Sequence, residues 1–223
     1  MIRPADIEAV TEAARHIQPA KGNYIEEDFV MNLQETVLDY QMSTTAVVRA
    51  LQHYRDNRWD EIRTGDDLAQ AMSRFPEDKE GNTALAQHLW GYNLWTRAQE
   101  LRDLAAYFGK IGVTDQEGLR RWAKSSDFKR DFEGRVRGLG IAVYHWLVMR
   151  QGVDTVKPDV HVRRFAERSV GRPLNDREVV EVVVAAAHQL DKKAYELDWA
   201  IWEASRGGAL EYPGGNVTPA PSD

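Results

Sequence analysis

Apolar residues recur along most of the chain at the three- and four-residue spacing that is typical of amphipathic helices. Within residues 26–40, for example, Phe29, Leu33 and Val37 fall on one face. Similar patterns predict further helices at 6–17, 44–57, 66–75, 82–90, 94–108, 114–124, 126–134, 141–150, from 159 onward, from 176 onward and at 191–205. We therefore expect an all-α fold.

Short polar residues before several of these segments predict where the helices begin. Ser43 and Asn82 are expected N-caps, and the segment 114–117 matches a capping box. The β-branched run 179–184 is compatible with a strand, but Asn175 precedes it as a cap and three alanines follow it. This context favours a helix, and no convincing strand pair is found.

A Gly-x-Gly turn formed by Gly138 and Gly140 precedes the helix predicted at 141–150, and Asp159 opens the next helix. Such a turn exposes backbone N–H groups at the positive end of a helix dipole, which suits a phosphate group. A carboxylate held close to a bound phosphate group is also close to the sugar that carries this phosphate, where it can take part in a reaction. Each feature also has a simpler interpretation, the glycines as a tight turn between helices and Asp159 as a helix N-cap.

Composition narrows the class of protein. A chain of 223 residues with 43% hydrophobic and 29% charged residues can form one large domain or two small helical lobes. It has no apolar run of 18 residues and no apolar signal core at its start, so we expect a cytoplasmic protein without a membrane span. The absence of cysteine excludes disulfides, zinc–thiolate sites and cysteine-ligated iron–sulfur clusters. We expect no metal and no other cofactor.

The formal charge is unevenly distributed. The chain carries a net charge of −6, which by itself argues mildly against a nucleic-acid partner. Residues 118–172, however, hold 13 Lys and Arg against 6 Asp and Glu. This basic window contains both the Gly-x-Gly turn and Asp159. Its basic residues either lie on solvent-exposed helix faces without a partner molecule or form a surface that binds a polyanion.

Four segments together resemble the helix-hairpin-helix (HhH-GPD) DNA glycosylase superfamily, which includes endonuclease III. The hairpin pattern of that superfamily, Leu-Pro-Gly-Val-Gly and a basic residue, is similar to Val-Arg-Gly-Leu-Gly-Ile at 136–141. Its Asp-Thr-His-x-x-Arg pattern is matched at Asp159, His161 and Arg164. Residues 38–44 resemble its Leu-Ser-x-Gln-x-Thr segment, and 91–98 resemble its Gly-x-x-x-x-Lys-Ala segment. The resemblance runs in order over about 25 to 206.

This resemblance implies a two-lobed fold in one globular unit of residues 1–206. One lobe would span about 42–145 and include the hairpin, and the other would combine 1–41 with 146–206. Residues 207–223 are rich in Pro and Gly, and we expect them to form a disordered tail. The expected partner is double-stranded DNA, in the nucleoid if the source is bacterial.

The resemblance also implies roles for individual residues. Asp159 would be catalytic, stabilising positive charge on the sugar and orienting or deprotonating water. Gln41 would fill the gap left by an extruded base, or it would simply end its helix. The other expected DNA contacts are Gly138, Gly140, Arg137, His161 and Arg164, and the candidates for a base pocket are Tyr40, Tyr144 and Trp95. His161 could equally be structural, Arg164 could instead pair with Glu167, and the aromatic residues could belong to the core.

Three residues depart from the superfamily pattern. Arg137 replaces the hairpin proline, Ile141 replaces the basic residue, and Ala142 occupies the position of the nucleophilic lysine of lyase-competent members. Without that amine no Schiff base can form. The expectation is therefore a monofunctional glycosylase that releases a damaged or mispaired base in base excision repair. The alternatives are a non-catalytic DNA-binding protein of the same fold and a helical protein–protein adaptor.

Overall fold

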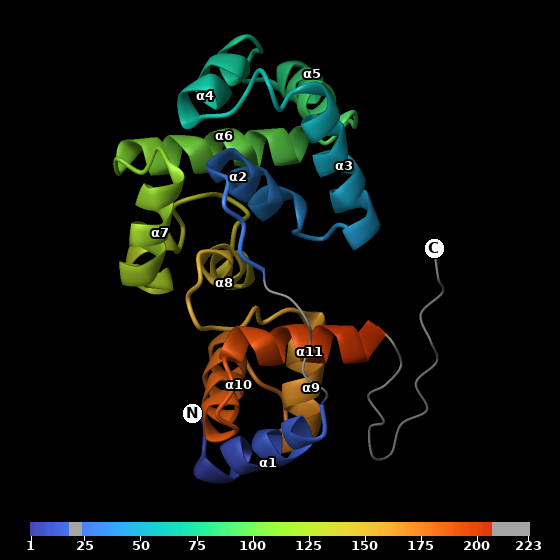
Figure 1. The fold of residues 1–223 in the computed structure, drawn as a ribbon, viewed down its shortest axis with the longest axis vertical. Helices are drawn as coiled ribbons and strands as arrows, with labels where there is room; N and C mark the ends of the chain where they lie inside the picture. The colour runs from blue at the N-terminus through green and yellow to red at the C-terminus, as the bar shows by residue number, and fades with distance from the viewer. Residues whose placement is uncertain (18–23, 207–223) are drawn as a thin grey trace. The chain divides into compact units, whose positions relative to one another are not determined.

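The structure is a computed structural model that describes residues 1–17 and 24–206, and every regular element in these residues is helical (Figure 1). The all-α expectation is therefore confirmed for the described part of the chain. The chain divides into two compact units. The central unit is Ile25–Val153, and the terminal unit combines Met1–Tyr24 with Asp154–Asp223. The tail expected to be disordered, 207–223, lies outside the described residues.

The central unit is built around one almost completely buried helix. Its elements are α2 (Phe29–Leu38), α3 (Thr44–Asn57), α4 (Gly65–Ser73), α5 (Lys79–Trp90), α6 (Trp95–Lys110), α7 (Gln116–Ser125), the short π-helical turn η1 (Phe128–Phe132) and α8 (Ile141–Arg150). Every residue of α2 except Glu35 is buried, because α3, α4, α6 and α8 all pack against this helix. The core of the unit therefore surrounds α2 (Figure 1).

The terminal unit joins a helix from the start of the chain to three from its end. Its elements are α1 (Pro4–Arg15), α9 (Val160–Val170), α10 (Asp176–Gln189) and α11 (Ala194–Arg206). Helix α1 packs against α9 and α10, and α11 packs against the same two helices (Figure 1). Val10 and Ala14 of α1 are fully buried in the same core as Phe165 and Val182. This core therefore depends on both ends of the sequence.

The boundaries between the units differ from those expected for the two lobes. The sequence placed them near 41/42 and 145/146, whereas the structure divides the chain after residues 24 and 153. Helix α2 and the end of α8 consequently belong to the central unit. The physical reason is the burial of α2 on all sides by helices of that unit.

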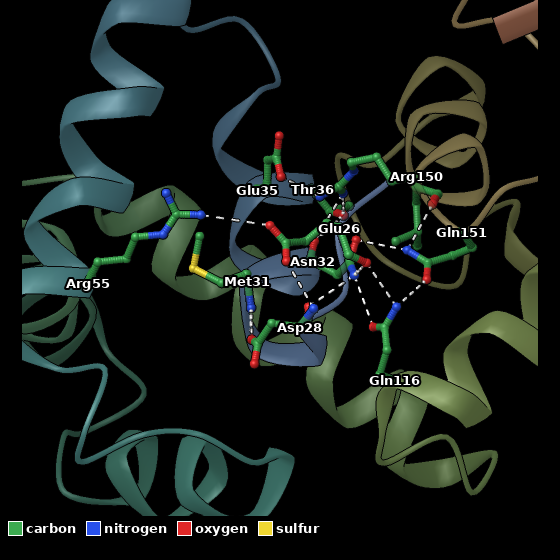
Figure 2. Close-up of polar contacts among 11 residues, drawn as sticks. Glu26, Asp28, Met31, Asn32, Glu35, Thr36, Arg55, Gln116, Arg150 and Gln151 are labelled. Atoms are coloured by element: carbon green, nitrogen blue, oxygen red, sulfur yellow. Dashed lines mark hydrogen bonds and ion pairs between the residues drawn. The ribbon is translucent and has the colours of Figure 1, made fainter. Parts of the chain in front are cut away.

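A buried arginine links α2 to the end of α8. Arg150 is 1% exposed, and its Nη1 lies 2.9 Å from Glu35 Oε2 (Figure 2). Its Nη2 donates to the backbone oxygen of Asn32 at 3.0 Å and also to the hydroxyl of Thr36. The ion pair with Glu35 and the two hydrogen bonds offset the free-energy cost of burying the charged guanidinium of Arg150.

Three side-chain amides continue this network from α2 to α7 (Figure 2). Asn32 donates to Gln116 Oε1 at 3.0 Å, Gln116 donates to Gln151 Oε1 at 2.9 Å, and Gln151 donates to Asn32 Oδ1 at 2.8 Å. Asn32 and Gln116 also donate to the backbone oxygen of Glu26. These hydrogen bonds close a ring, so each amide orients the next and fixes the register of α2, α7 and α8.

Several predicted helix starts are confirmed, and two are wrong. Ser43 caps α3, and Asn175 forms a capping box at α10, so the β-branched run 179–184 is helical. Asp78, rather than Asn82, caps α5, because Asn82 is buried and donates to Gln99 Oε1 at 2.9 Å. The cap of α7 is Asp115, whose side chain accepts from Gly118 N at 2.6 Å, and the segment predicted at 126–134 is η1 alone.

Candidate functional site

Asp159 lies at the start of α9, in the terminal unit, and it is the N-cap of this helix. Its Oδ1 accepts hydrogen bonds from His161 N at 2.8 Å and Val162 N at 3.0 Å. Both bonds use the same oxygen, and among the described residues none donates to Oδ2. The cap therefore fixes the carboxylate, and the second oxygen remains available to a water molecule or a substrate.

A second carboxyl group holds the loop in front of Asp159. Asp198 of α11 is 4% exposed, and its Oδ1 accepts from Lys157 N at 2.8 Å. Its Oδ2 accepts from the hydroxyl of Tyr24 at 3.2 Å. The ring of Tyr24 stacks on Trp199, with centroids 4.4 Å apart. The position of Asp159 is thus tied to α11 through a backbone hydrogen bond two residues earlier.

The charge of Asp159 acts on the buried carboxyl group of Asp198. Burial, followed by the nearby charge of Asp159, raises the pKa of Asp198 to about 8. Burial also raises the pKa of Tyr24, and the charge of Asp198 contributes in the same direction. A buried acid that keeps its proton near neutral pH next to a more exposed carboxylate is a pairing that enzymes use for proton transfer.

The two other predicted contacts of α9 have different surroundings. His161 is half-buried, and its backbone N–H is one of the two donors to Asp159. Arg164 is exposed, and no ion pair of its side chain occurs among the described residues. Arg163, in contrast, pairs with Asp176 and donates to the backbone oxygen of Leu174 at 2.7 Å, which makes it a structural residue.

The predicted hairpin lies in the central unit, before α8. Gly138 has φ of +86°, a conformation that strongly favours glycine, and Gly140 is the N-cap of α8. No side chain caps this helix, and its first turn has no acidic residue. Gly140 and Arg137 are both exposed. The start of α8 thus has the open backbone amides that the sequence predicted.

An acidic side chain lies against this turn. A Cβ atom on Gly138 would lie 2.8 Å from Glu100 Oε1. Glu100 pairs with Arg97 at 2.7 Å, and Arg97 donates to the backbone oxygen of Tyr40 and lies over the Tyr40 ring at 5.0 Å. Glu100 and Arg97 therefore bring Tyr40 and the hairpin into one cluster of the central unit, and the ion pair neutralises the charge next to the turn.

Gln41 has an unusual backbone conformation. Its φ is +58°, it is exposed, and its Nε2 donates to the Tyr40 hydroxyl at 3.1 Å. A glutamine in this left-handed region costs about 1 kcal/mol or more. Strained residues of this kind are concentrated at functional sites, which keeps Gln41 among the candidates.

The side chains of the two remaining base-pocket candidates contact other residues of the central unit. Tyr144 is 5% exposed, packs against Phe132 and Trp122, and shares a hydrogen bond of 2.9 Å with Ser126. In this packing its ring is part of the core. Trp95 is 39% exposed at the start of α6, where Lys79 Nζ lies 5.6 Å above its ring.

Much of the positive charge in the basic window is used in ion pairs. Six of its cationic side chains form ion pairs with carboxylates of described residues, namely Arg120, Arg121, Arg130, Arg150, Arg163 and Arg172. The charge that remains for a polyanion is therefore smaller than the sequence count indicates.

Sequence reasoning missed Asp198, Arg97 and Glu100. For Asp198 a signal exists, because it lies on the same helical stripe as Ala194, Leu197 and Ile201, which are all buried. An acid within an apolar stripe predicts a buried carboxyl group. Arg97 and Glu100 carry no comparable signal, since only the fold brings them to Gly138.

Two features are absent from the described residues. None of the helices there has the length and apolar character needed to cross a membrane. The same part of the chain has no cluster of three His, Asp or Glu side chains that could hold a metal ion.

The fold and the site define an all-helical protein with a fixed carboxylate at one helix start and open backbone amides at another. The chain belongs to the family described as a domain of unknown function, DUF8548, whose family model matches residues 30–206. No curated protein matches the chain, and no solved structure does.

Proposed function

We propose that this protein is a monofunctional DNA glycosylase, which hydrolyses the N-glycosidic bond of a damaged or mispaired base in duplex DNA. The observation that carries the proposal is the geometry of Asp159, whose Oδ1 is fixed by two backbone amides while Oδ2 accepts no hydrogen bond from a described residue. The order of the sequence segments that resemble the glycosylase superfamily supports it.

In the proposed reaction the bond between C1′ and the base breaks, and its electron pair leaves with the base. Positive charge develops on the sugar, and the negative charge of Asp159 stabilises it. Oδ2 orients a water molecule and accepts its proton as the water oxygen bonds to C1′. Asp198 acts as a positioning residue, because it holds Lys157 N in the loop that leads to Asp159.

The DNA contacts in this proposal, other than Asp159, come from the central unit. The exposed amides at the start of α8 and the side chain of Arg137 bind phosphate groups. Gln41 occupies the space left by the extruded base, and Tyr40 lies next to it. Ala142 provides no amine, so the product is an abasic site in an intact strand.

The test is base release from a panel of duplexes that contain alkylated, deaminated, oxidised or mismatched bases, read as strand cleavage after hot alkali. Asp159→Asn is the decisive variant, because asparagine caps helices as well as aspartate does and only the charge is lost. We expect cleavage after alkali for the wild type and a loss of at least about 100-fold in the variant. The melting temperature should change little.

A second candidate function is non-catalytic DNA binding, and the capping role of Asp159 favours it, since an N-cap needs no catalytic explanation. Wild-type protein that binds duplexes but releases no base from any of them would support this candidate. Strand cleavage without alkali would contradict the monofunctional assignment.

A further inference from the structure

A basic groove lies in the central unit between the end of α6, α7 and η1. Its volume is about 610 Å³. Four cationic side chains line it, Lys110, Arg121, Arg130 and Arg135, and Asp131 is the only acid among its lining residues. A groove lined mainly by one sign of charge attracts ligands of the opposite sign.

The acid in this groove is fully engaged with one of the four cations. Arg130 Nη2 lies 2.7 Å from Asp131 Oδ2, and Arg130 Nε lies 2.9 Å from Oδ1. The backbone N–H of Asp127 donates to Oδ2 as well, at 2.7 Å. Asp131 therefore neutralises Arg130, and among the described residues it forms no ion pair with the other three cations.

Those three cations are available to an anion. Arg135 donates one hydrogen bond, of 3.2 Å, to the backbone oxygen of Arg130, and Lys110 is exposed without an ion pair to any described residue. Arg121 pairs with Glu117, but both side chains are exposed, at 66% and 81%. Exposed ion pairs of this kind contribute little to the free energy of folding. A phosphate group can therefore replace Glu117 as the partner of Arg121 at a small cost in free energy.

Apolar and aromatic side chains also line the groove. Tyr107, Ile111 and Trp122 line it, and Ile111 is 44% exposed. Cationic side chains beside apolar ones fit the backbone of a DNA duplex, whose phosphates meet the cations while its deoxyribose rings meet the apolar side chains. A small anion would leave the apolar side chains unused, and an acidic peptide would not need them.

We propose that this groove binds the phosphate backbone of DNA as a contact surface additional to the hairpin. Arg135 at its edge precedes Arg137 by two residues, so the groove and the hairpin turn are adjacent along the chain. The inference rests on the DNA partner of the proposed function and extends it, because it assigns phosphate contacts to residues that have no counterpart in the hairpin pattern.

The test is the salt dependence of duplex binding, measured by fluorescence anisotropy for the full chain and for the triple variant Lys110→Gln, Arg121→Gln and Arg135→Gln. Each phosphate contact contributes about 0.9 to the slope of log K against log salt concentration, so the variant should lower that slope by about 3. Its affinity at low salt should fall by on the order of tenfold or more. All three residues are exposed, and a thermal melt checks that the variant is folded.

The control is Arg177→Gln, an exposed arginine of α10 that lies outside the groove, and it should lower the slope by less than 1. An unchanged slope in a folded triple variant would overturn the inference, even if wild-type protein releases bases. Groove-dependent DNA binding without base release would support the inference and count against the glycosylase proposal. Loss of binding to polyglutamate or inorganic phosphate, with DNA affinity unchanged, would also overturn it.

Discussion

At the scale of single residues, Asp198 is the most consequential side chain of the terminal unit. It is buried, it accepts hydrogen bonds from Lys157 N and the Tyr24 hydroxyl, and its pKa is raised to about 8. The burial that raises this pKa also makes the charged form costly. The protonation of one side chain should therefore influence the stability of the protein across the neutral pH range.

We predict that replacing Asp198 by asparagine changes how stability depends on pH. The folded protein holds the proton of Asp198 up to about pH 8, whereas the unfolded chain releases it near pH 3.9. Between these values the folded state binds more protons, so the contribution of Asp198 to stability is fully present below pH 4 and is lost as pH rises towards 8. Asparagine has no proton to release and avoids this loss.

The measurement is urea unfolding of wild-type protein and Asp198→Asn at several pH values between 4 and 8. The free energy of unfolding of the variant, relative to wild type, should rise over this range by at least about 1.4 kcal/mol, which corresponds to one pKa unit. A difference that stays constant with pH would show that Asp198 does not titrate in this window.

At the scale of elements, the junction of α2 with α8 depends on one buried cation. The side chain of Arg150 forms an ion pair with Glu35 and donates hydrogen bonds to Asn32 and Thr36 (Figure 2). No other residue of α8 forms a side-chain ion pair with a described residue of α2. Removal of one partner from a buried pair leaves the other charge without compensation.

We predict that Arg150→Ala destabilises the protein by about 3–5 kcal/mol. The matched control is Arg55→Ala, which removes an arginine that is 51% exposed and lies 3.8 Å from Glu26 (Figure 2). Because exposed ion pairs contribute little, the control should cost less than about 1 kcal/mol. Chemical denaturation of both variants measures the difference, and equal costs would contradict the role assigned to Arg150.

Helices could be predicted from the sequence because their apolar spacing is a local property. The first residues of helices were harder to predict where two residues could each serve as the N-cap. Asn82 is a good cap by type, but the fold buries it against Gln99, and Asp78 takes the position instead. The turn η1 was predicted as a longer helix, since a π-helical turn has nearly the same local pattern as an α-helix.

Parts of the candidate site depend on contacts that no local pattern contains. The sequence predicted the cap at Asp159 and the open helix start at Gly140, because both are local features. It did not predict that Glu100 would lie against Gly138, since 38 positions separate these residues in the sequence. For Tyr144 the sequence left both a base pocket and the core open, because an aromatic residue shows its burial only when its neighbours in the fold are known.

At the scale of the whole molecule, the two units differ in how the chain builds them. The central unit is one continuous segment, Ile25–Val153, with its own core around α2. The terminal unit needs α1 from the first segment, and Val10 and Ala14 of that helix are fully buried in its core. Only the central unit can therefore complete its core from contiguous sequence.

We predict that a fragment of residues 25–153 folds alone, with a cooperative thermal transition followed by circular dichroism. A fragment of residues 154–206 should not fold, because without α1 it exposes the apolar surface that Val10 and Ala14 cover. Addition of a peptide of residues 1–17 should restore its helicity. Cooperative unfolding of 154–206 without the peptide would contradict this account.

The split terminal unit has a consequence for the order of events during synthesis. Helix α1 leaves the ribosome before the partners of its buried face, because α9 and α10 follow more than 140 positions later in the sequence. At typical translation rates this delay is on the order of 10 s or longer, which is enough time for the central unit to fold first. Throughout that interval the nascent chain displays the apolar face of α1 to the cell, and chaperones that recognise such faces can bind it.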